Sequence, residues 1–245
     1  MSPVLLAVAH GSRDPAAQEC VLSLTGHVAR LADGIRVRTA FVQHATPSLA
    51  TALADAVTEA GTDGGCKPAV VPLLLSGGYH LSYDITAAAR GVGVPVARPL
   101  GPDPRLVRAL ADRLDQARVP DGVPVVLAAA GSRDPRALAD AKRQAAMLAA
   151  CRGAPVVAAF VSAAHPTVDE AVTVLASLTG KPVAVAAYLL APGLFHDRLW
   201  LGSGTWVSAP LGDHPAVADL VMQRFCVLAG QPAGSREALA GSPCF

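Results

Sequence analysis

Two histidines stand where strand-like apolar runs of this sequence end. His10 follows the run at 4–9, and His80 follows the stretch LLLSGGY at 73–79. Neutral imidazoles bind divalent metals and accept protons near neutral pH. Because ligands of open α/β sheets bind beyond the carboxyl ends of the strands, both side chains are expected at one rim. Few further Cys, His, Asp or Glu residues are close by, so the pair predicts an open, weakly held divalent metal rather than a closed zinc centre.

His10 belongs to a motif that occurs twice. HGSRDP at 10–15 recurs as AGSRDP at 130–135, where Ala130 takes the place of the histidine. Asp14 is a favourable N-cap and the proline after it suits the first position of a helix, so the shared loop is interpreted as a strand-to-helix turn. Since the second copy is expected to make the turn with alanine, His10 indicates chemistry rather than fold.

The sequence around His80 does not by itself distinguish a functional role from a structural one. Its counterpart in the second half of the chain is His196, which leaves a functional and a structural role equally open. Two glycines before His80 lack side chains and allow a ligand to approach the backbone closely. The residues expected to contact a substrate at this rim are Ser12, Arg13, Gln43, His44, Ser76, Gly77, Gly78 and Tyr79.

The duplication extends over most of the chain. Besides the opening motif, three blocks recur in the same order: 41–53 with 160–172, 74–80 with 189–196, and 98–110 with 209–221. Four ordered blocks indicate an internal duplication. The turn-rich segment VPDGVP separates the copies, so one lobe is expected at 1–119, a second, degenerate lobe at 123–231 and a flexible tail at 232–245.

Apolar runs of strand length alternate with Ala-rich stretches of helical length. Strands are predicted at 4–9, 35–42, 69–75, 93–97, 123–129, 155–161, 182–190 and 204–208. Helices are predicted near 15–31, 47–60, 103–117, 135–150, 166–178 and 213–230. Continuously apolar strands between helices are typical of parallel sheets covered on both faces, so the expected fold class is α/β.

The composition narrows the classes of partner. The chain has 245 residues, 52% of them apolar, and a net charge of +1, which gives no general attraction to nucleic acid or to an anionic membrane. The longest apolar runs contain Pro and Gly and are too short to span a membrane. The N-terminal run lacks the basic start of a signal peptide, so a cytoplasmic location is expected. An oligomer is compatible with the sequence.

The cysteines and loop motifs argue against several other chemistries. Cysteines occur at five widely spaced positions without a C-x-x-C pair: Cys20, Cys66, Cys151, Cys226 and Cys244. Reduced thiols are therefore expected, with no disulfide framework, zinc knuckle or iron–sulfur cluster. The sequence has no phosphate-binding glycine pattern, so no nucleotide cofactor is expected. It also lacks the G-x-S-x-G elbow of serine hydrolases, so that catalytic class is not indicated.

Three motifs together resemble the sirohydrochlorin chelatases of the CbiX/SirB class II type. They are VAHGSRDP near the N-terminus, F-V-x-x-A-x-P-S after the second strand and VVPLLLSGGYHLSYDI after the third. The resemblance implies two flavodoxin-like lobes with a tetrapyrrole in the cleft between them. It also implies a lyase that inserts Fe2+ or Co2+ into sirohydrochlorin without ATP, toward sirohaem or cobalamin. By the same resemblance, His10 and His80 are the catalytic, metal-binding pair.

One position departs from the family pattern. Many relatives carry a glutamate after the second strand, where this chain has Gln43 followed by His44. A neutral amide cannot act as a base or as a charged ligand. Either the two histidines suffice, or His44 takes over, or the metal preference or activity is altered.

The substrate implied by the resemblance carries several carboxylates, which favour arginine forks and helix N-termini. The arginines near predicted loop ends are Arg13, Arg98, Arg133 and Arg198. Two alternatives stay open. A chelatase for another metal such as nickel would use the same residues, and Gln43 is compatible with a non-catalytic carrier of metal or tetrapyrrole. His10, absent from the second copy, argues against a pure interaction scaffold.

Overall fold

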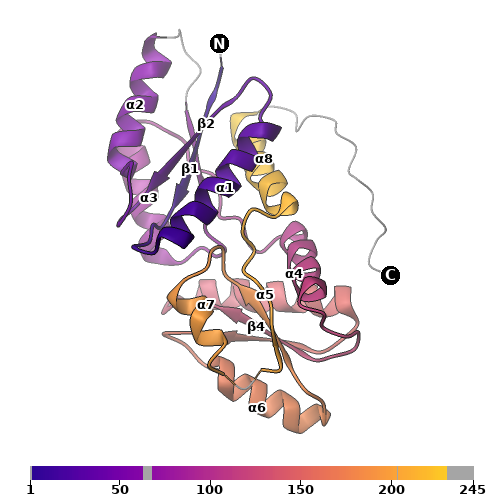
Figure 1. Cartoon of the computed structure of the whole chain (residues 1–245). Coiled ribbons are helices and arrows are strands. Elements are labelled where there is room, and N and C mark those ends of the chain that lie inside the picture. The colour runs from indigo at the N-terminus through magenta and orange to yellow at the C-terminus, as the bar shows by residue number, and fades with distance from the viewer. Residues whose placement is uncertain (1, 63–67, 203, 231–245) are drawn as a thin grey trace. The chain divides into compact units, whose positions relative to one another are not determined.

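The computed structural model describes residues 2–62, 68–202 and 204–230. It contains two compact units, of which one runs up to Leu100 and resumes at Asp213, while the other runs from Gly101 to Gly212 (Figure 1). Each unit has a parallel sheet flanked by helices, which confirms the predicted α/β class. The expected tail at 232–245 lies outside the described residues, as do Cys66 and Cys244.

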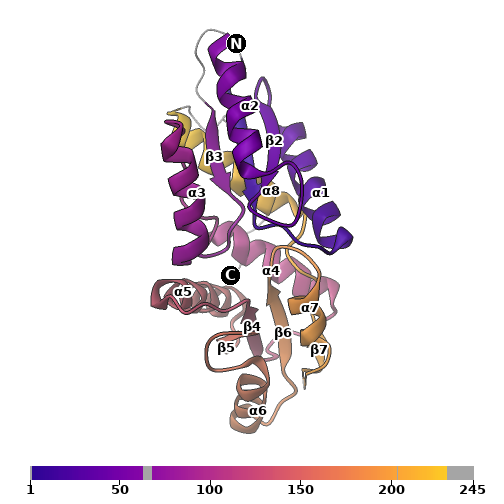
Figure 2. The ribbon, with the colours of Figure 1, turned by 90° about the vertical axis from the view of Figure 1, so that its left-hand side faces the viewer.

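The first unit is built around a buried central strand. Its strands are β1 (Val4–Ala9), β2 (Arg36–Phe41) and β3 (Ala69–Pro72), all parallel and in the order β2-β1-β3. The helices of this unit are α1 (Pro15–Leu31), α2 (Leu49–Thr62), α3 (Tyr79–Gly91) and α8 (Pro215–Ala229). Helices α1 and α8 pack side by side (Figure 1), and α2 and α3 cover the other face of the sheet (Figure 2). Every residue of β1 is buried, as expected of a strand covered on both faces.

The second unit repeats this plan. Its strands are β4 (Val125–Ala129), β5 (Val156–Phe160), β6 (Ala184–Tyr188) and β7 (Trp206–Val207) in the order β5-β4-β6-β7. Its helices are α4 (Pro104–Gln116), α5 (Pro135–Arg152), α6 (Val168–Thr179) and α7 (Leu194–Leu199). The order is that of the first four strands of a flavodoxin-like sheet, in which the ligand edge is the carboxyl end of the strands. None of the helices in the described part of the chain is both long and apolar enough to cross a membrane.

The predicted strands match the observed ones to within a few residues, with one exception. The run 93–97 contributes only an isolated bridge between Val96 and Val70. Pro95 has no N–H to donate and so limits this pairing. Two helices, α3 and α7, are not predicted by the hydrophobic pattern, because α3 begins directly after Ser-Gly-Gly and α7 directly after Pro-Gly, both of which favour loops.

The last helices of the two sequence repeats are exchanged between the units. Helix α4, which closes the first repeat, packs with α5 and β6 of the second unit, and α8 packs with α1 and β3 of the first. The units therefore differ from the expected lobes at 1–119 and 123–231. The blocks 98–110 and 209–221 give both helices the same start and a similar apolar stripe, so the repeat pattern does not determine which sheet each helix covers.

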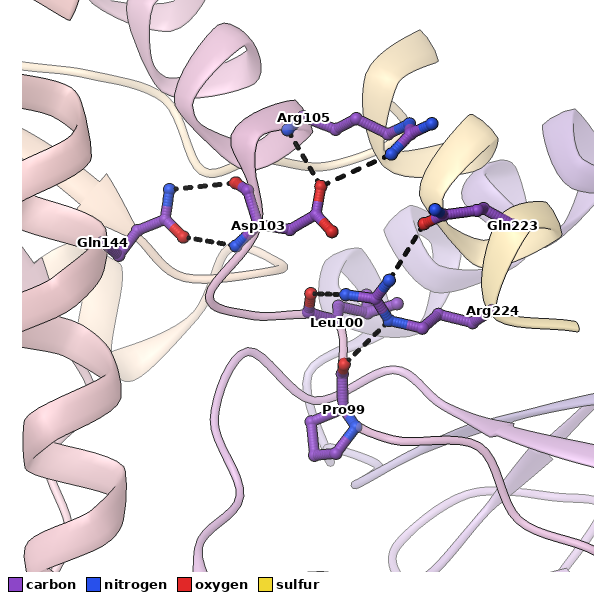
Figure 3. Close-up of polar contacts among 7 residues, drawn as sticks. All are labelled: Pro99, Leu100, Asp103, Arg105, Gln144, Gln223 and Arg224. Atoms are coloured by element: carbon purple, nitrogen blue, oxygen red, sulfur yellow. Dashed lines mark hydrogen bonds and ion pairs between the residues drawn. The ribbon is translucent and has the colours of Figure 1, made fainter. Parts of the chain in front are cut away.

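In the first unit, a buried arginine hydrogen-bonds to the backbone of the residues just before the boundary at Leu100. Arg224 of α8 is only 3% exposed. Its Nε donates to the carbonyl oxygen of Pro99 at 3.0 Å and its Nη2 to that of Leu100 at 2.6 Å (Figure 3). The Gln223 side chain accepts from Nη1 at 2.9 Å. The guanidinium thus satisfies two backbone acceptors at the end of this segment.

In the second unit, the buried Gln144 hydrogen-bonds to the backbone of Asp103, which lies further along the same connecting segment. The Asp103 N–H donates to Gln144 Oε1 at 2.9 Å, and Gln144 Nε2 donates to the Asp103 carbonyl at 3.3 Å (Figure 3). The Asp103 carboxylate caps α4 by accepting the Arg105 N–H at 3.0 Å. At the second boundary between the units, which follows Gly212, Arg113 Nη2 donates to the Leu211 carbonyl at 2.9 Å. Each unit therefore anchors its own ends of the connecting segments.

Candidate metal and substrate site

The backbone brings residue 10 beside residue 43 at the carboxyl end of β1. The ladder between β1 and β2 continues past both strands, since Val42 N–H donates to the Ala9 carbonyl and Gln43 N–H to the His10 carbonyl, both at 3.0 Å. Gly11 follows with φ +94°, and a Cβ at this position would lie 1.7 Å from the Gln43 carbonyl oxygen. Only glycine permits this close approach.

The His10 and Gln43 side chains form a hydrogen bond. Gln43 Nε2 lies 2.7 Å from His10 Nε2. An amide nitrogen donates and has no lone pair to offer, so His10 Nε2 is the acceptor and the imidazole proton resides on Nδ1. The lone pair on Nε2 is the one that a metal ion would bind in this tautomer.

The surroundings of His10 favour its neutral form. Partial desolvation of the ring, followed by repulsion from nearby His44, lowers the pKa of His10 below its ordinary value. His44 is exposed and has φ +62°, a left-handed conformation that places it directly beyond Gln43. His10 is therefore an imidazole ready to bind a cation at neutral pH.

The GSRDP loop is a strand-to-helix turn, as predicted. Ser12 Oγ accepts the Asp14 N–H at 3.0 Å, and Asp14 Oδ1 caps α1 by accepting the Ala16 N–H at 2.9 Å. The proline after Asp14 occupies the start of the helix. The Ser12 hydroxyl, expected to contact substrate, thus has a structural role, whereas the Arg13 side chain is exposed.

The second unit makes the same turn without the imidazole. Gly131 has φ +97°, and a Cβ there would lie 1.8 Å from the Ser162 carbonyl oxygen. The Ser162 N–H and hydroxyl both donate to the Ala130 carbonyl, at 3.0 and 2.8 Å. Asp134 caps α5 as Asp14 caps α1. The shared backbone therefore needs neither His10 nor Gln43, which supports a functional role for both.

The loop after β3 lies at the same edge as His10. β3 pairs with β1 in parallel, and the Leu73 N–H donates to the Val8 carbonyl at 2.8 Å. Ser76, Gly77 and Gly78 are half-buried in the loop that leads into α3. The side chains of Tyr79 and His80, in the first turn of α3, lie outside the described residues. The joint site of His10 and His80 therefore stays a prediction. Among the side chains that are described, no group of three His, Cys, Asp or Glu could hold a metal.

The counterpart of His80 in the second unit has a structural role. His196 Nε2 lies 3.0 Å from the Ser208 carbonyl oxygen, to which it donates. Its ring meets that of Trp200 edge-on, with centroids 6.3 Å apart and an interplanar angle of 88°. This structural role of His196 could not be predicted from the hydrophobic periodicity of the sequence. The exposed arginines proposed to bind carboxylates are Arg13, Arg98, Arg133 and Arg198.

Comparison with solved structures places the molecule among chelatase-fold proteins. SirB from Bacillus subtilis with Fe3+ is 26% identical and superposes with a TM-score of 0.77, over 94% of this chain and 96% of that one. The sirohydrochlorin chelatase SirB from Bacillus subtilis subspecies spizizenii in complex with cobalt is 22% identical, with a TM-score of 0.76 over 96% and 98% of the two chains. The latter likeness concerns the fold.

Sequence comparison defines the family. The CbiX family pattern matches residues 4–117 and again 124–227, which recovers the internal duplication. The sirohydrochlorin cobaltochelatase of Methanosarcina barkeri is 31% identical over 127 residues, covering 46% of this chain and 95% of the relative. The chain belongs to the CbiX family, and the resemblance to sirohydrochlorin chelatases is confirmed.

Proposed function

We propose that this protein is a sirohydrochlorin chelatase that inserts Fe2+ or Co2+ into sirohydrochlorin without ATP, as a lyase in sirohaem or cobalamin synthesis. The observation that carries the proposal is the neutral His10 imidazole at the carboxyl edge of the first CbiX repeat. The second repeat keeps the same backbone with Ala130. A residue that the turn does not require, at the edge where such sheets bind ligands, is best explained by chemistry.

The first step is capture of the metal ion, which is a substrate. His10 Nε2 releases the Gln43 amide and binds the ion, at the cost of one hydrogen bond worth about 1 kcal/mol. His80 is the proposed second ligand. Water and neutral imidazoles hold the ion weakly, so it can be passed on to the tetrapyrrole nitrogens.

The second step exchanges protons for metal. Two pyrrole N–H protons leave as the ring binds the divalent ion, so the products are the metallated tetrapyrrole and two protons. Gln43 cannot accept a proton. His10 and His80, once the ion has left them, are the proposed acceptors and pass the protons to water. Coordination of the ion by the tetrapyrrole nitrogens provides the driving force and offsets the loss of the two protons, so no nucleotide is required.

The substrate is proposed to bind along the same rim. Arg13 is exposed in the GSRDP loop that follows His10 and would pair with a peripheral carboxylate. Gly77 and Gly78 would leave space for the edge of the macrocycle, and His44 lies near enough to His10 to lower its pKa. We propose further that the protein acts in the cytoplasm, with reduced thiols at Cys20, Cys151 and Cys226, and without an iron–sulfur cluster.

An anaerobic absorbance assay of sirohydrochlorin with Fe2+, Co2+ or Ni2+ tests the proposal. The protein should accelerate metallation over the uncatalysed rate, and His10→Ala and His80→Ala should abolish the acceleration. His165→Ala is the matched control, since His165 is an exposed histidine of the second unit paired with Glu170. Tight binding of metal or tetrapyrrole without acceleration would instead establish a carrier, and preference for Ni2+ would change the assigned metal.

A further inference from the structure

Helix α6 and the neighbouring strand β5 expose three aliphatic side chains. Leu178 of α6 is 79% exposed, Val174 one turn before it is 57% exposed, and Val157 of β5 is 39% exposed. Residues four apart lie on the same side of a helix, so Val174 and Leu178 form one stripe. Val157 lies on the α6 face of the sheet, because it is two residues from Ala159, which belongs to the same buried cluster as residues of α6. Val157, Val174 and Leu178 are called the α6 patch.

The first unit has charged residues at the three equivalent positions. Counted from the repeated blocks 41–53 and 160–172, these are Arg38, Asp55 and Glu59. Arg38 forms an ion pair with Glu59, so the strand position and the helix position lie within reach of each other. The same fold therefore accepts charges at all three places. The aliphatic side chains of the second unit are not required by the fold, which indicates that another surface covers them.

The patch adjoins an open sheet edge. Among the described strands, β5 pairs only with β4, and Figure 2 shows it at the end of its sheet. The Val125 N–H of β4 donates to the Pro155 carbonyl at 2.9 Å, which sets the alternation of backbone groups along β5. The N–H and C=O groups of Val156 and Ala158 therefore point away from β4. Such outward groups are a template for a further strand.

The charges around the patch indicate what covers it. Charged side chains commonly protect an edge strand from pairing, and β2 carries Arg36 and Arg38, whereas β5 carries no charge. The charged residues of α6 are Asp169 and Glu170, both acidic and in its first turn. An anionic membrane is therefore disfavoured. A second copy of the same surface matches in both respects, because it offers an open strand edge and uncharged aliphatic side chains.

Pairing of two β5 strands would bring two copies of the α6 patch together. About a two-fold axis perpendicular to the sheet, the two strands are antiparallel and both α6 helices lie on the same face. Neighbouring strands are about 4.8 Å apart, and α6 contacts both β5 and β4, so its axis lies about 5 Å from the two-fold axis. The two α6 helices are then about 10 Å apart, which is the separation at which helices pack.

We infer that the protein forms a symmetric dimer by antiparallel pairing of β5 with β5 of a second copy. Val156 exchanges two hydrogen bonds with Ala158 of the second copy, which places the two Val157 side chains opposite each other on the α6 face. Val174 and Leu178 of both copies cover them. The dimer does not depend on the proposed function, because it uses only the second unit.

Sedimentation equilibrium of the full-length protein over a dilution series tests the inference. The wild type should show a monomer–dimer equilibrium. Leu178→Glu should raise the dimer Kd about tenfold or more, because it buries two like charges beside the two-fold axis. The double variant Val157→Arg with Leu178→Glu reproduces the ion pair of the first unit, so it should fold and stay monomeric. Leu22→Glu is the matched control, because Leu22 is 53% exposed on α1 of the first unit and its replacement should leave the Kd unchanged.

Amide hydrogen exchange distinguishes strand pairing from contact between helices alone. The Val156 and Ala158 N–H groups should exchange more slowly in the concentrated wild type than in monomeric Leu178→Glu. Equal exchange in the two would overturn the pairing of β5. A wild type that is monomeric at every concentration, or a dimer that Leu178→Glu leaves intact, would overturn the inference as a whole. Binding of vesicles or of a different protein by a monomeric wild type, lost in Leu178→Glu, would overturn the dimer and assign the α6 patch to that partner.

Discussion

The Gln43 side-chain amide donates to Nε2 of His10 across 2.7 Å. This contact fixes the imidazole tautomer and occupies the lone pair that a metal needs. Because the donor is neutral, it adds no charge to a ring whose pKa is already lowered by desolvation and by His44. Relatives with a glutamate at the equivalent place would have the opposite effect, since a carboxylate favours the imidazolium.

Gln43→Glu therefore should raise the pKa of His10 and the affinity for metal together. Because its pKa is lowered, wild-type His10 stays neutral at pH values just below about 6.5, the ordinary pKa of a histidine. Metal binding should therefore persist as the pH falls past 6.5. In the variant the same loss should begin at higher pH. The added negative ligand should tighten Co2+ binding by about tenfold at pH 8. NMR titration of the His10 ring nitrogens and calorimetry with Co2+ would check both. A lower pKa in the variant would contradict the assignment of this contact.

His10→Ala should remove activity without unfolding the protein. Removal of a ligand and proton acceptor should slow metallation by about 10²-fold or more. The free energy of unfolding should change by less than about 1 kcal/mol, because Ala130 occupies the equivalent position of the same turn and His10 is exposed. Urea denaturation and the metallation assay measure the two effects. A large loss of stability would show that the imidazole is structural.

The two turn glycines should be costly to replace, and to similar extents. Gly11→Ala and Gly131→Ala each force a Cβ into a carbonyl oxygen, that of Gln43 or Ser162, as well as a positive φ. Each should destabilise its unit by more than about 2 kcal/mol.

Gly122→Ala is the control, because Gly122 has φ +71° with no atom within 4 Å of the added Cβ, and should cost only about 1 kcal/mol. Thermal unfolding would rank the three variants. Equal effects at Gly11 and Gly122 would mean that the close approach is not what requires glycine.

The turn and its duplication are readable from the sequence because they depend on local chemistry. Asp14 caps a helix that starts with proline, and the glycine before it accommodates a backbone oxygen, in both repeats. The contact of His10 with Gln43 is not local, but it follows from the pairing of two strands whose carboxyl ends coincide. The position of the candidate site is predictable for that reason.

The exchange of α4 and α8 is not predictable in this way. Both helices begin with a capping residue and a proline, Asp103 in one and His214 in the other, and both bury an apolar face. What distinguishes their positions are tertiary contacts, such as Gln144 with the Asp103 backbone. Helix α7 is not predicted from the hydrophobic pattern either, because its six residues are too few to show helical periodicity.

Arg224 should be essential to the exchanged arrangement, and its replacement tests this. Arg224→Met keeps much of the buried aliphatic volume but leaves the carbonyls of Pro99 and Leu100 without their donor. A buried acceptor without a partner costs about 1–3 kcal/mol, so the variant should lose about 3 kcal/mol of unfolding free energy. Arg105→Met removes an arginine whose contact with Asp103 is partly exposed, and should cost less than about 1 kcal/mol. Urea denaturation measures both. If the two variants are equally stable, the buried guanidinium does not hold the connecting segment, and the apolar faces of α4 and α8 determine the exchange by themselves.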